Sequence, residues 1–236
     1  MDVLERLENL KRKISATAAK AGKTSDSIQL VCVIKQAKIS DIIKVIRSGY
    51  VNLAENKVQS LQEKYSLLKD NLSPDEFSQI IWHLIGHLQT NKVKPALDLV
   101  SMIQSVDSLH LAERISRQAQ KINKKIDILV QVNISCEESK FGIEISDVTD
   151  FILKIINLPG INIKGLMGIG PFVEDAEQTR GGFRKLAEVF KQTNKILEAR
   201  GNFSLTVLSL GMSNDYLVAI EEGSNMLRIG SEIFKD

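Results

Sequence analysis

Two glycine- and serine-rich turns near the end of the chain contain the residue types that bind a phosphate group. One lies in 208–215 (LSLGMSND) and the other in 226–231 (MLRIGS), and each follows a short apolar run. Gly and Ser let backbone N–H groups approach an anion closely, and a helix N-terminus adds a favourable dipole. Ser213, Asn214 and Asp215 offer capping side chains for a helix after the first turn. Two such turns side by side predict a cradle for one phosphate.

Lys35 offers a second kind of chemistry. It follows the apolar run 30–34, so we expect its amine to emerge from an apolar wall. A partly desolvated lysine has a lowered pKa and can act as an imine-forming nucleophile. The alternative is a strand-end lysine in solvent, which is the commoner case for such a residue taken alone. The lysine and the phosphate cradle together indicate a ligand that carries both an aldehyde and a phosphate, and pyridoxal phosphate has both groups.

Alternating strand-length apolar runs and amphipathic segments must position these residues. Many of the runs are rich in Val and Ile, as expected for strands buried on both faces. The expected strands are 29–34, 50–54, 80–85, 99–104, 126–134, 161–167, 205–208 and 225–229. Helical spacing occurs in 41–48, 109–123, 144–157 and 183–199. This alternation predicts an α/β fold, a parallel (β/α)8 barrel of the TIM type. A doubly wound open sheet is the structural rival, because local pattern does not show closure.

The two ends of the chain differ from a plain barrel. Apolar residues at helical spacing predict an extra helix before the first strand. They are Val3, Leu4, Leu7, Leu10, Ile14 and Ala18. Only 231–236 follow the last strand, which is too short for a full eighth helix, so we expect the N-terminal helix to cover the barrel wall there. The length of 236 residues suits a single domain, 1–236, and no linker or repeat divides it.

Composition argues against several classes of partner. The chain has 31 basic and 29 acidic residues and a net charge of +2, which gives no reason to expect nucleic acid or a membrane surface. It shows neither a secretory signal nor an apolar run that could span a bilayer, so we expect a cytoplasmic protein. The two cysteines suggest no disulfide framework or metal site. Cys32 is typical of a small core residue, and Cys136 lies in a polar loop where most thiols have no role.

In a barrel of this kind, the active site lies at the C-terminal ends of the strands. Polar and glycine-rich positions follow or end most of the expected strands. They include Lys35, Glu55, Asn56, Gly86, His87, Gln89, Asn133, Met167, Ser209, Gly211, Met212, Ser213, Arg228, Gly230 and Ser231. These positions are scattered in the sequence, but the fold would bring them to one mouth.

Eight short motifs at these positions carry a family resemblance. They are 31–35 (VCVIK), 55–59 (ENKVQ), 82–92 (WHLIGHLQTNK), 131–135 (QVNIS), 137–140 (EESK), 165–167 (GLM), 210–215 (LGMSND) and 228–231 (RIGS). The chain resembles the pyridoxal phosphate homeostasis protein family, relatives of the alanine racemase barrel. The motifs occur in family order over nearly the whole chain, which makes the resemblance highly specific.

The resemblance implies that Lys35 binds pyridoxal 5′-phosphate as a covalent imine. It implies that the phosphate is held by Met212, Ser213, Gly230 and Ser231. Ser209 then lies near the cofactor, and Arg228 matches the family position that faces the pyridine nitrogen. An arginine there disfavours protonation of that nitrogen, which makes the ring a poorer electron sink. Taken without the resemblance, Arg228 is equally consistent with an ion pair at the barrel end.

Four further residues are placed around the cofactor by the resemblance. Asn56 would bond the region of the ring hydroxyl, His87 would line the mouth, and Met167 would pack on the ring. His87 equally suits the cap of a helix near 89–91, and Met167 equally suits an ordinary core position. Lys140 is a candidate second lysine for cofactor exchange, with a solvated loop lysine as its alternative.

Three functions compete. The first is a binding protein for vitamin B6 homeostasis, which holds pyridoxal phosphate, limits the free aldehyde and serves cofactor-dependent apoenzymes. The second is an amino-acid racemase-like enzyme, which needs an acid/base group on each face of the substrate. The resemblance implies that alanine racemases take their second base from an added C-terminal domain of a partner subunit. The chain ends at Asp236, so we expect no such domain, no robust catalysis and a monomer. The third is an aldolase-like barrel with Lys35 as nucleophile.

Overall fold

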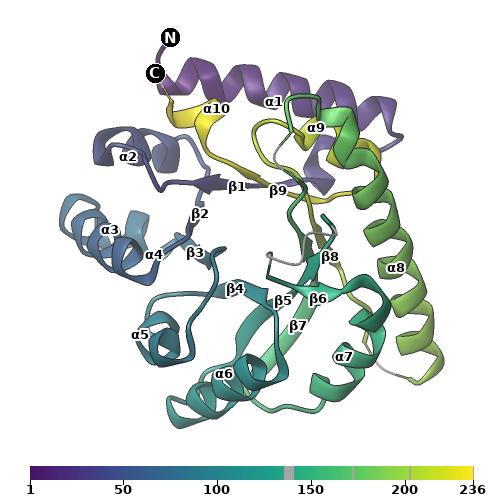
Figure 1. Ribbon diagram of the computed structural model, residues 1–236. Helices are drawn as coiled ribbons and strands as arrows, with labels where there is room; N and C mark the ends of the chain where they lie inside the picture. The colour runs from purple at the N-terminus through teal and green to yellow at the C-terminus, as the bar shows by residue number, and fades with distance from the viewer. Residues whose placement is uncertain (136–140, 172, 202, 236) are drawn as a thin grey trace.

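The protein forms a closed parallel barrel surrounded by helices (Figure 1). The structure is a computed structural model that describes residues 1–135, 141–171, 173–201 and 203–235. The barrel strands are β1 (Gln29–Val33), β2 (Asn52–Glu55), β3 (Ile81–Leu84), β4 (Met102–Val106), β5 (Ile126–Asn133), β7 (Ile161–Gly168), β8 (Val207–Ser209) and β9 (Met226–Ile229). All neighbours pair in parallel, in the order β4-β3-β2-β1-β9-β8-β7-β5, and β4 also pairs with β5. That last pairing closes the sheet, so the predicted barrel is confirmed and the open-sheet alternative is wrong.

A further short strand, β6 (Ile143–Glu144), pairs with the end of β5. It lies at the start of the segment 144–157, where one continuous helix was expected. The helix α7 instead begins at Val148, after a single 3-10 turn. Gly142 has φ of 138°, and a Cβ there would lie 2.5 Å from the backbone nitrogen of Asn133. A glycine is therefore required for β6 to approach β5, and a strand of two residues leaves no periodic signal in the sequence.

The helices follow the strands around the outside of the barrel (Figure 1). They are α1 (Val3–Lys20), α2 (Ile39–Arg47), α3 (Val58–Asn71), α4 (Pro74–Ser78), α5 (Val93–Leu97), α6 (Leu109–Lys121), α7 (Val148–Ile155), α8 (Arg180–Ala199), α9 (Tyr216–Glu221) and α10 (Ser231–Phe234). The expected segments 41–48, 109–123 and 183–199 correspond to α2, α6 and α8. The sequence did not indicate α3, because only Leu61 and Leu68 of this helix are buried and two residues make no apolar stripe.

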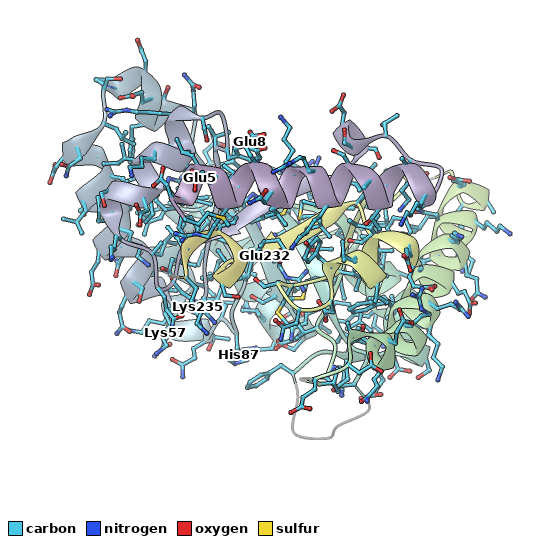
Figure 2. All side chains as sticks on the ribbon, turned by 90° about the horizontal axis from the view of Figure 1, so that it is seen from above. Glu5, Glu8, Lys57, His87, Glu232 and Lys235 are labelled. Atoms are coloured by element: carbon cyan, nitrogen blue, oxygen red, sulfur yellow. The ribbon has the colours of Figure 1, made fainter. Side chains whose placement is uncertain are left out.

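The N-terminal helix covers the barrel wall beside the last strand, as predicted. Buried apolar residues along α1 face inward, whereas Leu4 is 36% exposed and lies on the outer side. The helix packs against α9 and α10, and Figure 2 shows it lying alongside them. Arg6 Nε donates to the Ile233 carbonyl over 2.7 Å, and Lys13 forms an ion pair with Glu232 at 2.7 Å. The α1 helix therefore holds the short α10 in place.

Two separate apolar clusters stabilise the fold. The larger one fills the space between the sheet and the helices. The smaller one lies inside the barrel, and its buried members are Val31, Val33, Ala54, Met102, Leu129, Met167 and Met226. Side chains of successive residues in a strand point to opposite faces, so residues such as Val31 and Val33 point inward while Cys32 points outward. The interior also holds the buried polar residues His83, Gln104, Ser209 and Arg228.

Candidate functional site

A cavity of about 670 Å³ opens at the C-terminal ends of the strands. Its apolar lining comes mainly from Val33, Ile85, Ile169, Pro171, Val173 and Phe234. The predicted site residues that line it are Lys35, Met212, Ser213, Arg228, Gly230 and Ser231. The turns after β1, β8 and β9 therefore meet around one space, as the barrel topology requires.

Lys35 lines this cavity from the turn that follows β1. The preceding Ile34 is fully buried, whereas Lys35 is an exposed residue. The expectation of a partly desolvated amine in an apolar wall is therefore wrong. The apolar run ends one residue too early to enclose the side chain, so the amine is accessible from water and from the cavity.

The two glycine- and serine-rich turns lie side by side, as the sequence predicted. The Ser213 hydroxyl accepts hydrogen bonds from the backbone N–H groups of Gly230, at 3.3 Å, and Glu232, at 3.4 Å. A Cβ at Gly230 would lie 3.0 Å from the Val33 carbonyl oxygen, so a glycine lets this turn lie close against β1. Backbone donors of the second turn thus converge on the hydroxyl of the first.

Asp215 shapes the first turn in a way that the sequence did not predict. Its carboxylate accepts a hydrogen bond of 2.6 Å from the backbone N–H of Met212, and it makes no side-chain cap to α9. Burial raises the pKa of Asp215, while the Met212 hydrogen bond and the charge of Arg228 act in the opposite direction. The side chain is 5% exposed and borders the cavity, so it stabilises the turn from inside the site.

Arg228 brings a buried positive charge to the cavity. Its residue is 3% exposed, Nη1 donates to the Ser209 hydroxyl over 2.5 Å, and Nη2 donates to the Gly168 carbonyl over 2.8 Å. Burial lowers the pKa of Arg228 to about 10, and Asp215 opposes this shift. The guanidinium is therefore protonated at neutral pH. Within the described part of the chain, no carboxylate forms a direct ion pair with Arg228, but Asp215 is near enough for the two charges to attract each other.

Ser209 and Met167 lie inside the barrel and do not line the cavity. Both are 0% exposed. Ser209 contacts Arg228 and also donates to Gln104 Oε1 over 2.8 Å. Met167 belongs to the apolar cluster of the interior, as its core alternative predicted. These two positions support the floor of the site from below.

Asn56 and His87 also stand outside the lining of the cavity. Asn56 is exposed, and its backbone N–H donates to Glu55 Oε2 over 3.1 Å. The His87 Nδ1 atom lies 3.0 Å from Asp107 Oδ2, and its ring stacks on Phe141 with centroids 3.8 Å apart. His87 thus has a carboxylate and an aromatic partner in place of the helix cap considered from the sequence. Figure 2 shows His87 at the same end of the barrel as the cavity-lining Lys235.

Sequence reasoning did not identify two cations of the cavity, Lys38 and Lys235. Lys38 is the N-cap residue of α2, three positions after Lys35, and Lys235 directly follows α10, but neither position is a recognisable signal. Lys140 and Cys136 lie outside the described residues. Within the described ranges, no group of three or more His, Cys, Asp or Glu residues could hold a metal ion. No described helix is long and apolar enough to cross a membrane.

Comparisons with known proteins agree with this geometry. Residues 6–236 match the family described as "Alanine racemase, N-terminal domain". A pyridoxal phosphate homeostasis protein of Aquifex aeolicus is 36% identical over 234 residues, which cover 99% of this chain and 98% of that protein. The chain belongs to the family of pyridoxal phosphate homeostasis proteins. A member from Escherichia coli K12 is 32% identical over 99% of this chain and 96% of its own length.

Solved structures of relatives share the barrel. PipY of Synechococcus elongatus, in a structure with pyridoxal phosphate bound, is 28% identical with a TM-score of 0.82, covering 99% of this chain and all of that one. An alanine racemase of Clostridium difficile is only 16% identical, with a TM-score of 0.72 over 98% of this chain and 56% of that one. The racemase comparison supports a common fold and carries no argument about activity.

Proposed function

We propose that the protein binds pyridoxal 5′-phosphate in this cavity and holds it for vitamin B6 homeostasis without robust catalysis. The observation that carries the proposal is the convergence of three groups on one space. These are the accessible amine of Lys35, the paired turns at Ser213 and Gly230, and the buried guanidinium of Arg228. The bound pyridoxal phosphate of the Synechococcus elongatus relative supports the same ligand.

In this proposal, Lys35 holds the cofactor covalently. Lys35 would supply the primary amine for a condensation with the aldehyde that the cofactor carries, which would link the two as an imine with loss of water. This condensation needs no oxidant or reductant and is reversed by water. An exposed lysine suits reversible holding, because water reaches the bond. We assign the phosphate to Met212, Ser213, Gly230 and Ser231, which line the cavity. The Met212 and Gly230 N–H groups donate to Asp215 and to Ser213 Oγ in the structure, so phosphate binding would exchange these two hydrogen bonds.

Arg228 favours holding over catalysis. At the family position that faces the pyridine nitrogen, the charged guanidinium would disfavour protonation of that nitrogen, so the ring would withdraw electrons less strongly. Ser209 has a supporting role, since it accepts a hydrogen bond from Arg228 and stays below the cavity. Asn56, His87 and Met167 are outside the binding set that we propose.

The racemase-like alternative finds less support in the cavity. Two-base racemisation needs a proton donor or acceptor on each face of the substrate. Among the described residues that line the cavity there is no tyrosine, histidine or cysteine. The only lining carboxylate in this described set is Asp215, which accepts the Met212 N–H. The remaining ionisable residues of this described lining are Arg228 and the exposed Lys38 and Lys235, so no tyrosine or histidine is available there as a second base.

We further propose that the protein acts as a cytoplasmic monomer that exchanges the cofactor with apoenzymes. Exchange requires release as well as binding, which a hydrolysable imine allows. Light scattering on the loaded protein tests the monomer, and transfer to an added cofactor-free enzyme, followed by recovery of that enzyme's activity, tests exchange. A stable dimer, or no transfer over hours, would contradict these two points.

The binding proposal is tested by absorbance and mass spectrometry. The wild-type protein mixed with pyridoxal phosphate should show an imine band in the visible range, and borohydride should fix the cofactor on the peptide that contains Lys35. The Lys35→Ala variant should lose both signals, while Lys38→Ala, a change of another cavity lysine, should keep them. Retention of the band in Lys35→Ala would overturn the assignment. Rapid Lys35-dependent racemisation of alanine would favour the enzyme alternative.

A further inference from the structure

A continuous chain of polar side chains crosses the interior of the barrel below the cavity. Arg228 Nη1 donates to Ser209 Oγ at 2.5 Å, and Ser209 Oγ donates to Gln104 Oε1 at 2.8 Å. Gln104 Nε2 lies 3.2 Å from His83 Nδ1, and His83 Nε2 lies 3.1 Å from Asn52 Oδ1. The hydrogen-bond chain therefore links β9 and β8 to β4, β3 and β2, and Ser209 and Gln104, which join the two groups, are 105 residues apart in sequence.

The middle of the chain is shielded from water. Ser209 and Gln104 are 0% exposed and His83 is 1% exposed. Buried polar groups of this kind cost free energy unless each donor and acceptor has a partner. Among the described residues, no buried side-chain nitrogen or oxygen lacks a partner. At the far end, Gln29 Nε2 donates to Asn52 Oδ1 over 2.7 Å, so the chain ends at the first strand.

Arg228 sets the direction of the hydrogen bonds from Ser209 to Asn52, and the Gln104 amide nitrogen also donates to Met226 Sδ over 3.3 Å. A guanidinium only donates, so Ser209 must accept from it and is free to donate its own proton. That proton goes to the Gln104 carbonyl oxygen, which turns the Gln104 amide nitrogen toward His83. His83 Nδ1 must then accept, and its proton lies on Nε2, where Asn52 Oδ1 accepts it. In the reverse direction, the buried Ser209 proton would have no acceptor.

We propose that Gln104 and His83 are positioning residues that hold Arg228 in place through this one-directional hydrogen-bond chain. Ser209 transmits the constraint, and the neutral Nε2–H form of His83 completes it. Two of the five guanidinium donors are thereby assigned to Ser209 and Gly168, so the group is fixed at the cavity floor. The effect on cofactor binding rests on the proposed function, whereas the donor-to-acceptor direction of these hydrogen bonds is a property of the protein alone.

The surroundings of His83 are consistent with this neutral form. Burial lowers the pKa of His83 to about 4. A protonated imidazole would direct an N–H group at Gln104 Nε2, where a donor already lies. The neutral ring is therefore required for the chain to be complete at neutral pH.

The first test uses nitrogen-15 NMR of the protein without cofactor. The protein has three histidines, so their imidazole signals are separable, and a His83→Gln variant identifies those of His83. We expect one tautomer for His83, protonated on Nε2 with an unprotonated Nδ1. The exposed His110 on α6 serves as an internal control and should show exchange between forms. An Nδ1–H tautomer, a mixture or an imidazolium at pH 7 would overturn the assigned direction.

A second test removes the group that sets the direction. In Ser209→Ala, Gln104 loses its hydroxyl donor, and its amide can turn over, so His83 should become a mixture of tautomers. Ser209→Thr keeps the hydroxyl and should restore the Nε2–H form. A single unchanged tautomer in Ser209→Ala would show that Arg228 does not impose the direction through Ser209.

The third test measures the effect on the cofactor. Gln104→Met keeps the approximate shape but breaks the chain, so we expect roughly tenfold weaker binding of pyridoxal phosphate and a shifted absorption maximum. Gln120→Met, on the exposed side of α6, is the matched control and should change neither. Unchanged affinity and spectrum in Gln104→Met would overturn the positioning role.

The failure of this inference can be distinguished from the failure of the proposed function. If the wild type shows the Nε2–H tautomer but no imine band, the proposed function is wrong while the assigned direction of the hydrogen bonds is correct. If Gln104→Met does not fold, the NMR of the wild type and of Ser209→Ala still decides the assignment.

Discussion

The mouth of the barrel has two sides that use their polar residues differently. Over β1, β8 and β9, Lys35, Ser213 and Arg228 face a cavity. Over β2 and β3, the polar residues are engaged with each other: the fully buried Glu55 forms an ion pair with Lys64, and His87 pairs with Asp107. Side chains of similar chemistry are thus available to a ligand on one side and committed to the fold on the other.

A polar residue at the C-terminal end of a barrel strand is therefore a better site candidate when some of its hydrogen-bonding groups have no partner within the protein. The two lysines make the point. Lys35 is exposed and lines the cavity, whereas Lys64 has a side chain 13% exposed and contacts both Glu55 and the Ile34 carbonyl. The following predictions test whether the two sides differ in stability and in binding as this division requires.

The largest expected effect separates the two lysines. Lys64→Ala should lower the free energy of unfolding by about 3 kcal/mol, because it leaves the Glu55 charge buried without its partner. Lys35→Ala should change it by less than about 0.5 kcal/mol, because Lys35 is exposed. Urea unfolding followed by circular dichroism measures both. An equal loss in the free energy of unfolding of the two variants would show that the two sides of the mouth do not differ in this way.

A similar contrast is expected for two glycines. A Cβ at Gly86 would lie 2.1 Å from the Asn56 carbonyl oxygen, so Gly86→Ala should cost about 2 kcal/mol of stability through overpacking. A Cβ at Gly230 would meet Val33 at 3.0 Å, which is a milder contact but one at the predicted phosphate turn. Gly230→Ala should therefore weaken pyridoxal phosphate binding more than it lowers the melting temperature. The opposite ranking would contradict the division of the mouth.

A charge introduced at Ser213 tests whether this turn binds the phosphate. Ser213→Asp should weaken pyridoxal phosphate binding by at least about tenfold, because a carboxylate would lie against the phosphate. The matched control is Ser108→Asp at the N-cap of α6, where Ser108 Oγ accepts from Leu111 N–H and an aspartate also caps well. Cofactor titration followed by absorbance distinguishes them. Unchanged affinity in Ser213→Asp would contradict the phosphate assignment.

The smallest effect is expected at His87. Its contact with Asp107 involves a histidine side chain that is 37% exposed, so His87→Ala should cost less than about 1 kcal/mol of stability. Cofactor affinity should stay within about twofold of wild type, because His87 does not line the cavity. Titration and thermal unfolding test the two statements. A large loss of affinity for pyridoxal phosphate would show that His87 belongs to the binding site.

Much of the fold was predictable because its signals are local. Strands buried on both faces appear as apolar runs, and all eight barrel strands were expected, with bounds that differ by one to three residues at several ends. The 3.6-residue rhythm identified α1, α2, α6 and α8. Helix α3 and the short β6 were missed, since the first buries few side chains and the second is too short to show a period.

The site was predictable in part. Ser213, Gly230 and Ser231 lie in turns whose glycines and serines are adjacent in sequence, so the cavity lining there was expected. His87 was not predictable, because its orientation depends on Asp107 and Phe141, which are distant along the chain. Gln104 and His83 looked like ordinary strand residues, and no local signal pointed to their hydrogen bonds.

Local sequence patterns were enough to predict the alternation of strands and helices, the glycine- and serine-rich turns after the last two barrel strands, the position of Lys35 and the family. Each of these depends on side-chain type and short-range spacing. Only the three-dimensional arrangement shows which polar groups face the cavity and which are paired with each other. It also fixes the direction of the hydrogen bonds that run from Arg228 through Ser209 and Gln104 to His83. Hydrogen bonds are satisfied by neighbours in space, and closing the barrel brings together residues that the sequence separates by a hundred positions or more.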